Sequence, residues 1–185
     1  NFMTDDYLNE RATSPRMKLL YEINPQWSVN FATGRYSQLP QLPEIVDHTG
    51  NPNLDYIDST HYVIGVEHQW RHGWSWHIDT YYKQLENVVI GISDPVAPDY
   101  GNNYSNDASG NAYGMELLLN KKMTDQFYGW LSLSLSKTRR RDERTGETRP
   151  FDFDRPAILN LVGNYQLDEN WLLGFKWTIQ SGLLY

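Results

Sequence analysis

The histidines and hydroxyl groups of this chain are the first candidates for chemistry, but their spacing forms no catalytic motif. His48, His61, His68, His72 and His77 are scattered along the sequence. They form no helical His-x-x-x-His pair of the kind that holds zinc, and no catalytic motif surrounds any serine. The sequence therefore predicts no catalytic residue and no metal site.

Carboxylates offer a second possibility. Glu67 and Asp79 lie on segments that we predict to be neighbouring strands, and paired carboxylates are able to transfer protons. The simpler interpretation is that they belong to a polar strand face. We predict that the protein is not an enzyme and carries no cofactor.

Two charged segments suggest binding rather than catalysis. Residues 99–107, DYGNNYSND, contain oxygen ligands that suit calcium, but they lack the ordered spacing of an EF-hand and are interpreted as a turn-rich loop. The basic run Arg139-Arg140-Arg141 is followed at once by Asp142 and Glu143, which indicates a solvated mixed-charge loop. The net charge of -7 argues against a nucleic-acid partner.

The composition is that of one ordered domain. The chain has 185 residues and 14% aromatic residues, so disorder is not expected. The mean hydropathy of -0.65 is low for a globular core. No apolar run approaches the length of a transmembrane helix, no signal-peptide pattern opens the chain, and the absence of cysteine excludes disulfides.

Residues 127–136, FYGWLSLSLS, give the clearest structural signal. Leucine and serine alternate strictly from Leu131 to Ser136, which is typical of a strand with one apolar and one polar face. The same alternation predicts strands over residues 16–23, 27–37, 59–70, 74–85 and beyond, 110–121, 157–166 and 171–180.

Short turns and long loops alternate between these strands, as they do in outer-membrane barrels. The long connections are predicted at residues 38–58, 87–109 and 137–154. Aromatic residues gather on the apolar face near the short turns, at Tyr21, Trp27, Trp70, Trp74, Phe127, Tyr165 and Trp171. Such a girdle is expected at a membrane interface. Tyr62, Tyr82, Tyr113 and Trp177 are candidates for the opposite girdle.

The predicted fold class is all-β, an antiparallel up-and-down transmembrane β-barrel segment with about eight strands. Charged residues on the other strand face support it, because a wet lumen accepts unpaired charges that a packed interior does not. These residues are Lys18, Glu22, His77, Asp79, Lys83, Glu116 and Lys176.

An ordered series of short segments resembles the barrel of TonB-dependent outer-membrane receptors. The segments are residues 14–16, 34–40, 51–54, 61–62, 65–67, 79–83, 104–106, 114–117, 154–156 and 180–182. The resemblance covers nearly the whole chain. It implies about 22 strands in the complete barrel. We expect residues 1–185 to be part of that barrel domain, without its plug domain, TonB box and closing strands.

The resemblance also implies a function. The receptor would take up a scarce solute (an iron chelate, cobalamin, another metal complex or a glycan) across the outer membrane of a Gram-negative bacterium, with energy from the TonB complex. The implied partners are outer-membrane lipid, the plug domain of the same receptor, the TonB complex through the absent N-terminal part, and a small-molecule ligand. A passive porin-like channel, a structural or adhesion barrel and a soluble β-sandwich binding module remain as alternatives.

The long loops are the predicted ligand mouth, because loops on a rigid scaffold carry recognition. Their polar and aromatic side chains are able to stack on a ligand or hydrogen-bond to it. The candidate ligand-binding residues are Tyr56, Tyr100, Tyr104, Arg140 and Arg144.

Overall fold

The fold is built almost entirely from β-strands. The computed structural model describes residues 2–5, 10–46, 50–92, 103–124, 126–151 and 154–182. Its longer strands are β3 (Arg16–Asn24), β4 (Trp27–Gln38), β5 (Ile57–Gln69), β6 (Trp74–Gly91), β7 (Tyr104–Thr124), β8 (Phe127–Asp142), β10 (Ala157–Gln166) and β11 (Leu172–Gln180). The shorter elements are β1 (Phe2–Asp5), β2 (Glu10–Thr13), β9 (Thr148–Pro150), α1 (Leu42–Ile45) and the 3-10 turn η1 (Arg71–Gly73). No helix within the described ranges is long and apolar enough to cross a membrane.

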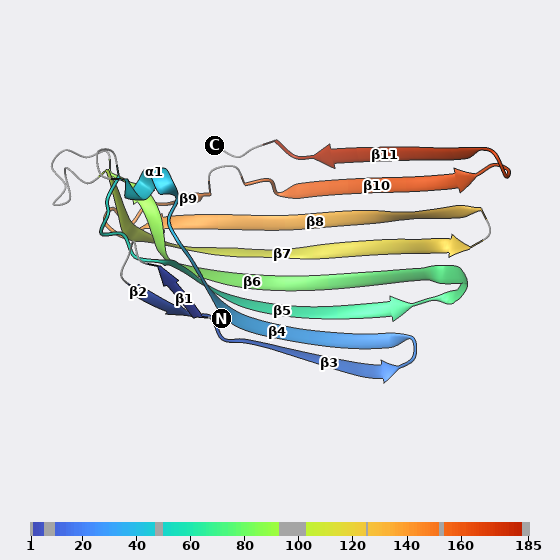
Figure 1. Cartoon of the computed structure of the whole chain (residues 1–185), viewed down its shortest axis with the longest axis horizontal. Helices are drawn as coiled ribbons and strands as arrows, with labels where there is room; N and C mark the ends of the chain where they lie inside the picture. The colour runs from blue at the N-terminus through green and yellow to red at the C-terminus, as the bar shows by residue number, and fades with distance from the viewer. Residues whose placement is uncertain are drawn as a thin grey trace.

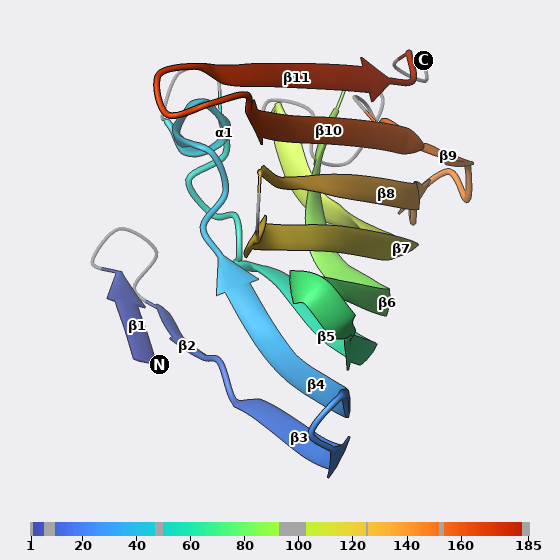
Figure 2. The same cartoon turned by 90° about the vertical axis from the view of Figure 1, so that its right-hand side faces the viewer.

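Strands that follow each other in sequence pair in space. The order across the large sheet is β3-β4-β5-β6-β7-β8-β10-β11, all antiparallel, and β9 adds to β8 to make nine strands. Short turns lie at one end of the strands, whereas α1 and β9 lie at the other end (Figure 1). The sheet is a single curved layer that stays open between β3 and β11 (Figure 2). The predicted antiparallel meander is confirmed.

The register gives the sheet two continuous faces. Directly opposed residues share a face, because successive side chains on each strand alternate. One such row runs through Tyr21, Val29, Val66, Ile78, Leu117, Leu133, Leu159 and Ile179. The next row runs through Leu20, Asn30, Gly65, Asp79, Glu116, Ser134, Ile158 and Gln180. We call the first surface the apolar face and the second the polar face.

The apolar face has no second layer over it in the described part of the chain. Ile64, Leu173 and Phe175 expose 58%, 59% and 51% of their surfaces. A soluble sandwich would bury this face against another sheet. An exposed apolar face that runs across every long strand is what a lipid-facing barrel wall requires.

Aromatic residues form an opposed row on this face. Tyr62, Tyr82 and Tyr113 lie directly opposite one another on β5, β6 and β7, as expected for one girdle. Trp177 does not lie in this row, because the register places it in the row that contains Trp27 and Trp76.

The short turns are fixed by local hydrogen bonds. The Asn24 side-chain oxygen accepts hydrogen bonds from the backbone N–H groups of Gln26 and Trp27, at 2.9 and 3.0 Å. The Asp168 carboxylate accepts in the same way from Asn170 and Trp171, at 2.8 and 3.0 Å. Such Asx turns set the register of the hairpins that they close.

The long connections are more regular than the sequence predicts. Strand β6 continues to Gly91 and β7 begins at Tyr104, so residues 87–91 and 104–109 belong to paired strands. Strand β8 continues to Asp142 and pairs with β9, so Arg139–Arg141 is strand and not loop. The first residues include the β1–β2 pair. Register shifts between Leu85 and Val88 and between Val88 and Ile90 interrupt the alternation of apolar and polar side chains from which strands are predicted.

Candidate functional site

The loop end of the sheet has its own small hydrophobic core. Val88, Ile90 and Ala108 are buried, and Ile57 and Phe151 pack against them, together with Leu85. The core thus joins the β6–β7 hairpin to the start of β5 and to the segment that follows β9. Because apolar packing fixes these connections, the loop end is a structured rim.

Hydrogen bonds tie the connection between β4 and β5 to the β6–β7 hairpin. The Asn51 side chain donates to the Tyr104 carbonyl oxygen at 2.9 Å. The Asp55 N–H donates to the Asn106 side-chain oxygen at 2.7 Å, and the Asn106 amide donates to the Asn87 carbonyl at 2.8 Å. Side chains from distant parts of the sequence therefore meet at this rim.

The described candidate ligand residues contribute to the rim in different ways. Tyr56 is 4% exposed, and Arg140 is 9% exposed with its guanidinium 5.0 Å from the centre of the Phe151 ring. Arg144 donates to the Asp142 carboxylate at 3.2 Å in the β8–β9 turn. Tyr104 is half-buried at the start of β7.

Tyr100, the remaining candidate, lies outside the described residues. Residues 99–102 of the segment weighed for calcium also lie outside them. Within the described ranges, no group of three or more His, Asp or Glu side chains is arranged to hold a metal ion. A ligand-contact role for the five candidates stays a prediction, although the burial of Tyr56 and Arg140 gives both a part in packing.

The polar face carries two clusters that belong to the strands instead of the loops. The first is a stack of Arg16, Tyr36 and His61. The Arg16 guanidinium lies 4.2 Å from the centre of the Tyr36 ring, which stacks on the His61 ring at 4.2 Å and 26°. His61 lies directly opposite Lys83, whose ammonium is 4.8 Å from the centre of the Tyr81 ring.

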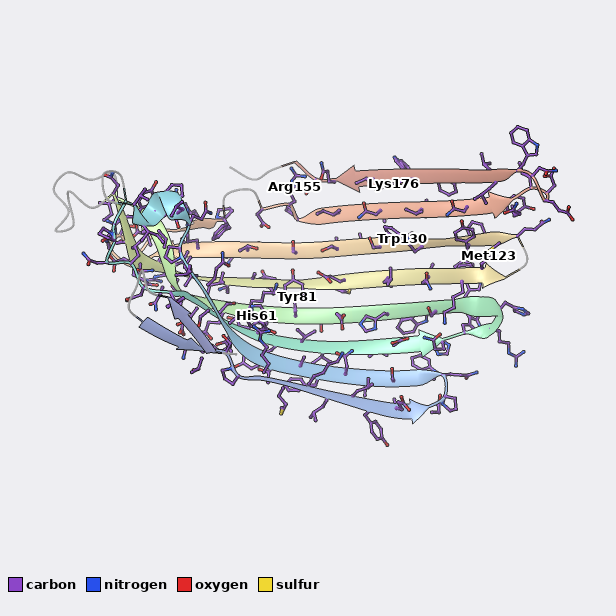
Figure 3. All side chains as sticks on the ribbon, in the orientation of Figure 1. His61, Tyr81, Met123, Trp130, Arg155 and Lys176 are labelled. Carbon is purple, nitrogen blue, oxygen red and sulfur yellow. The ribbon has the colours of Figure 1, made fainter. Side chains whose placement is uncertain are left out.

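Figure 3 shows His61 and Tyr81 on the part of the sheet nearer the loop end. Cation–π contacts of this kind are attractive because the ring face carries partial negative charge. The rings thus hold the basic groups in place without neutralising their charge.

The second cluster lies nearer the short turns and is acidic. The His77 ring bonds to the Asp79 carboxylate at 2.6 Å and is 3.9 Å from the Glu67 carboxylate. Glu67 lies opposite His77, whereas Asp79 lies opposite Gly65. The predicted proximity of Glu67 and Asp79 is confirmed, and the imidazole between them provides the link.

Gly65 makes room for this cluster. A Cβ atom at Gly65 would overlap the Asp79 carboxylate and the Asn30 side-chain amide. Asp79 also lies directly opposite Glu116 on β7. Carboxylates are thus concentrated on adjoining strands of the polar face.

Sequence reasoning missed the stack of Arg16, Tyr36 and His61. These residues come from three strands, and the connection between β4 and β5 is too long to define their register. Only local signals were available: His61 lies four residues before Gly65 on the same face of β5, and Arg16 begins the strand that pairs with β4. Lys83 was already assigned to the polar face.

Comparison with known proteins assigns the family. The chain belongs to the family described as TonB dependent receptor-like, beta-barrel, whose model matches residues 1–185. A search of curated proteins found no match.

Solved structures with the same fold include two receptors and an iron transporter. A ferric enterobactin receptor (PfeA) variant from Pseudomonas aeruginosa, in complex with enterobactin, has a TM-score of 0.75, with 16% identity over 96% of this chain and 29% of that one. The FrpB iron transporter from Neisseria meningitidis has a TM-score of 0.70 and 12% identity over 90% of this chain and 26% of that one. The alcaligin outer-membrane receptor FauA from Bordetella pertussis has a TM-score of 0.65 and 18% identity over 93% of this chain and 30% of that one.

These likenesses establish the fold. The chain spans less than a third of the length of each of these three structures. Its two-faced sheet therefore corresponds to one sector of a larger barrel wall.

Proposed function

We propose that the chain is part of the barrel of an outer-membrane receptor that takes up a scarce solute with energy from TonB. The observation that carries the proposal is the family match over residues 1–185. The exposed apolar face supports it, since this face suits contact with lipid in the outer membrane of a Gram-negative bacterium.

The polar face would line the passage and contact the plug domain of the same receptor. Glu67, His77 and Asp79 are polar groups suited to such a contact, and Leu20, Leu118 and Leu172 add apolar patches to the same face. A wall that alternates charged groups and leucines fits a folded plug better than an open water column. This observation favours an active receptor over a passive channel.

The loop end would form part of the ligand mouth. Its connections are held by the core around Val88 and by the hydrogen bonds of Asn51 and Asn106. A preorganised rim loses less conformational entropy on binding than a free loop. Iron chelates are the first ligands to test, since the solved relatives named above include a ferric enterobactin receptor and an iron transporter.

Growth-linked uptake by the full-length receptor tests the proposal, with TonB active and with TonB inactivated. We expect uptake to require TonB. Replacing residues 41–55 or 143–147 by a short Gly-Ser linker should weaken uptake and leave the amount of receptor in the outer membrane unchanged. Uptake that survives the loss of TonB would leave a passive channel instead. Uptake that needs TonB but is unchanged by both replacements would show that these loops are not part of the ligand mouth.

A further inference from the structure

Basic side chains gather in one row of the polar face, in the half nearer the loop end. Arg16, Gly34, His61 and Lys83 lie directly opposite one another in turn on β3, β4, β5 and β6. Neighbouring strands are about 4.8 Å apart, so Arg16 and Lys83 lie on backbones separated by about 14 Å. We call Arg16, His61 and Lys83 the cationic row.

Arg16 and Lys83 carry the positive charge of this row, and the contacts of both groups within the described residues are with aromatic rings. In the described part of the chain, neither Arg16 nor Lys83 has a carboxylate within ion-pairing distance. Both contact aromatic rings instead, namely those of Tyr36 and Tyr81. The nearby Arg35–Asp58 ion pair, at 2.7 Å, belongs to the opposite face, because Arg35 follows Gly34 in the strand.

The sign of the wall changes toward the short turns. Asp79 is four residues before Lys83 on the same face of β6, and an extended strand rises about 3.4 Å per residue. The carboxylates of Asp79 and Glu116 share one row, and Glu67 lies in the row beyond. The wall therefore presents positive charge near the loops and negative charge about 13 Å below.

We propose that the cationic row is an anion-binding subsite on the barrel wall, which takes a solute with clustered anionic oxygens. The inference rests on the proposed function, in which the polar face lines the passage. A guanidinium, an ammonium and an imidazole in one row supply several N–H donors to such oxygens. The acidic rows below repel the same anion and hold it at the level of the cationic row until the passage is opened.

Binding of a fluorescent anion to the purified full-length receptor tests this subsite. The probe is pyrene tetrasulfonate, followed by fluorescence anisotropy in detergent solution. We expect a loss of affinity of about tenfold for each of Arg16→Gln and Lys83→Gln, since a hydrogen bond to a charged group is worth roughly that factor. Binding to the wild-type receptor should also weaken as salt is added.

Lys176→Gln is the matched control. Lys176 lies on the polar face of β11, remote from the row, and the substitution removes the same charge (Figure 3). We expect this variant to bind the probe as the wild type does. Equal losses in Lys176→Gln and Lys83→Gln would show a general effect of net charge and overturn the subsite.

An acidic segment of the plug is the competing occupant. In that case the wild-type receptor would not bind the probe, and the Arg16→Gln and Lys83→Gln variants would lower the temperature of thermal unfolding instead. That result also overturns the proposal. The binding assay needs no TonB. A receptor that does not bind the probe therefore overturns the subsite and does not contradict TonB-dependent uptake. Uptake without TonB likewise overturns active transport and does not contradict probe binding.

Discussion

Leu133 of β8 lies directly opposite Leu117 of β7 in the middle of the apolar face. Leu159 lies opposite Leu133 on its other side, so apolar neighbours flank it on both strands. Ser134, the next residue, lies opposite Glu116 and Ile158 on the polar face. A single step along β8 therefore moves a side chain from the apolar face to the polar face.

We expect Leu133→Arg to destabilise the full-length receptor by about 2–4 kcal/mol in lipid, the cost of arginine near the bilayer midplane. Ser134→Arg should cost much less, because its side chain enters a polar surface. Urea titration of receptor refolded into lipid vesicles measures both. Equal midpoints for the two variants would contradict the assignment of the faces.

Close packing between β7 and β8 gives a second prediction. A Cβ atom at Gly114 would overlap the carbonyl oxygen of Leu135 and lie 2.8 Å from the Tyr81 hydroxyl oxygen. Since a backbone atom yields less than a flexible side chain, Gly114→Ala should destabilise the receptor by about 1–3 kcal/mol. Thermal unfolding in detergent measures the loss. Gly182→Ala is the control, since no atom of the described residues lies within 4 Å of its added Cβ atom. A loss of equal size there would refute the steric explanation.

The strands were predictable because each carries its own signal. Alternation over Leu131 to Ser136 and the turn residues Asn24 and Asp168 are local features, and local hydrogen bonds fix the hairpins. Antiparallel pairing of sequence neighbours then follows with little ambiguity. The β6–β7 extension was not predictable in the same way. Val88, Val89 and Ile90 are buried in succession, so the period-two pattern is lost there.

The candidate site was predictable only where it depended on one strand or one short hairpin. Glu67 and Asp79 flank the turn between β5 and β6, and their proximity follows from that turn. The contact of Arg16 with Tyr36, and of Tyr36 with His61, depends on the register across a long connection. The burial of Tyr56 and Arg140 depends on packing between segments far apart in sequence, which no local pattern encodes.

The turn between β8 and β9 should respond to acid. Burial raises the pKa of the Asp142 carboxyl, but hydrogen bonds from the Arg144 side chain and from the backbone of Arg144 and Thr145 outweigh it and leave the pKa below its ordinary value of 3.8. Because the folded pKa is lowered, the stabilisation is complete above pH 3.8 and is lost as the pH falls through the folded pKa.

Hydrogen exchange of the Gly146 amide reports this turn, since that N–H donates to the Asp142 carbonyl at 2.8 Å. We expect its protection to be constant from neutral pH down to about pH 4 and to decrease below it. Asp142→Asn should reduce protection at neutral pH and remove the dependence. Protection that increases on acidification would show that burial dominates the Asp142 pKa.

The last prediction concerns which end of the sheet faces the outside of the cell. In outer-membrane barrels the short turns are periplasmic and the longer connections extracellular. The sequence has no cysteine, so a single introduced thiol is a clean label. Pro25 and Glu169 lie in exposed short turns, whereas Asn53 and Glu143 are exposed at the loop end.

We expect a membrane-impermeant maleimide to label Asn53→Cys and Glu143→Cys of the full-length receptor on intact cells, and to leave Pro25→Cys and Glu169→Cys unlabelled. Permeabilised cells are the control, in which all four thiols should react. The physical reason is location, since the reagent reaches only the outer surface while the membrane is intact. Labelling of the short-turn thiols on intact cells, with protection of the loop-end thiols, would reverse the orientation. The cationic row would then lie nearer the periplasm, on the wrong side of the wall to receive a solute from outside.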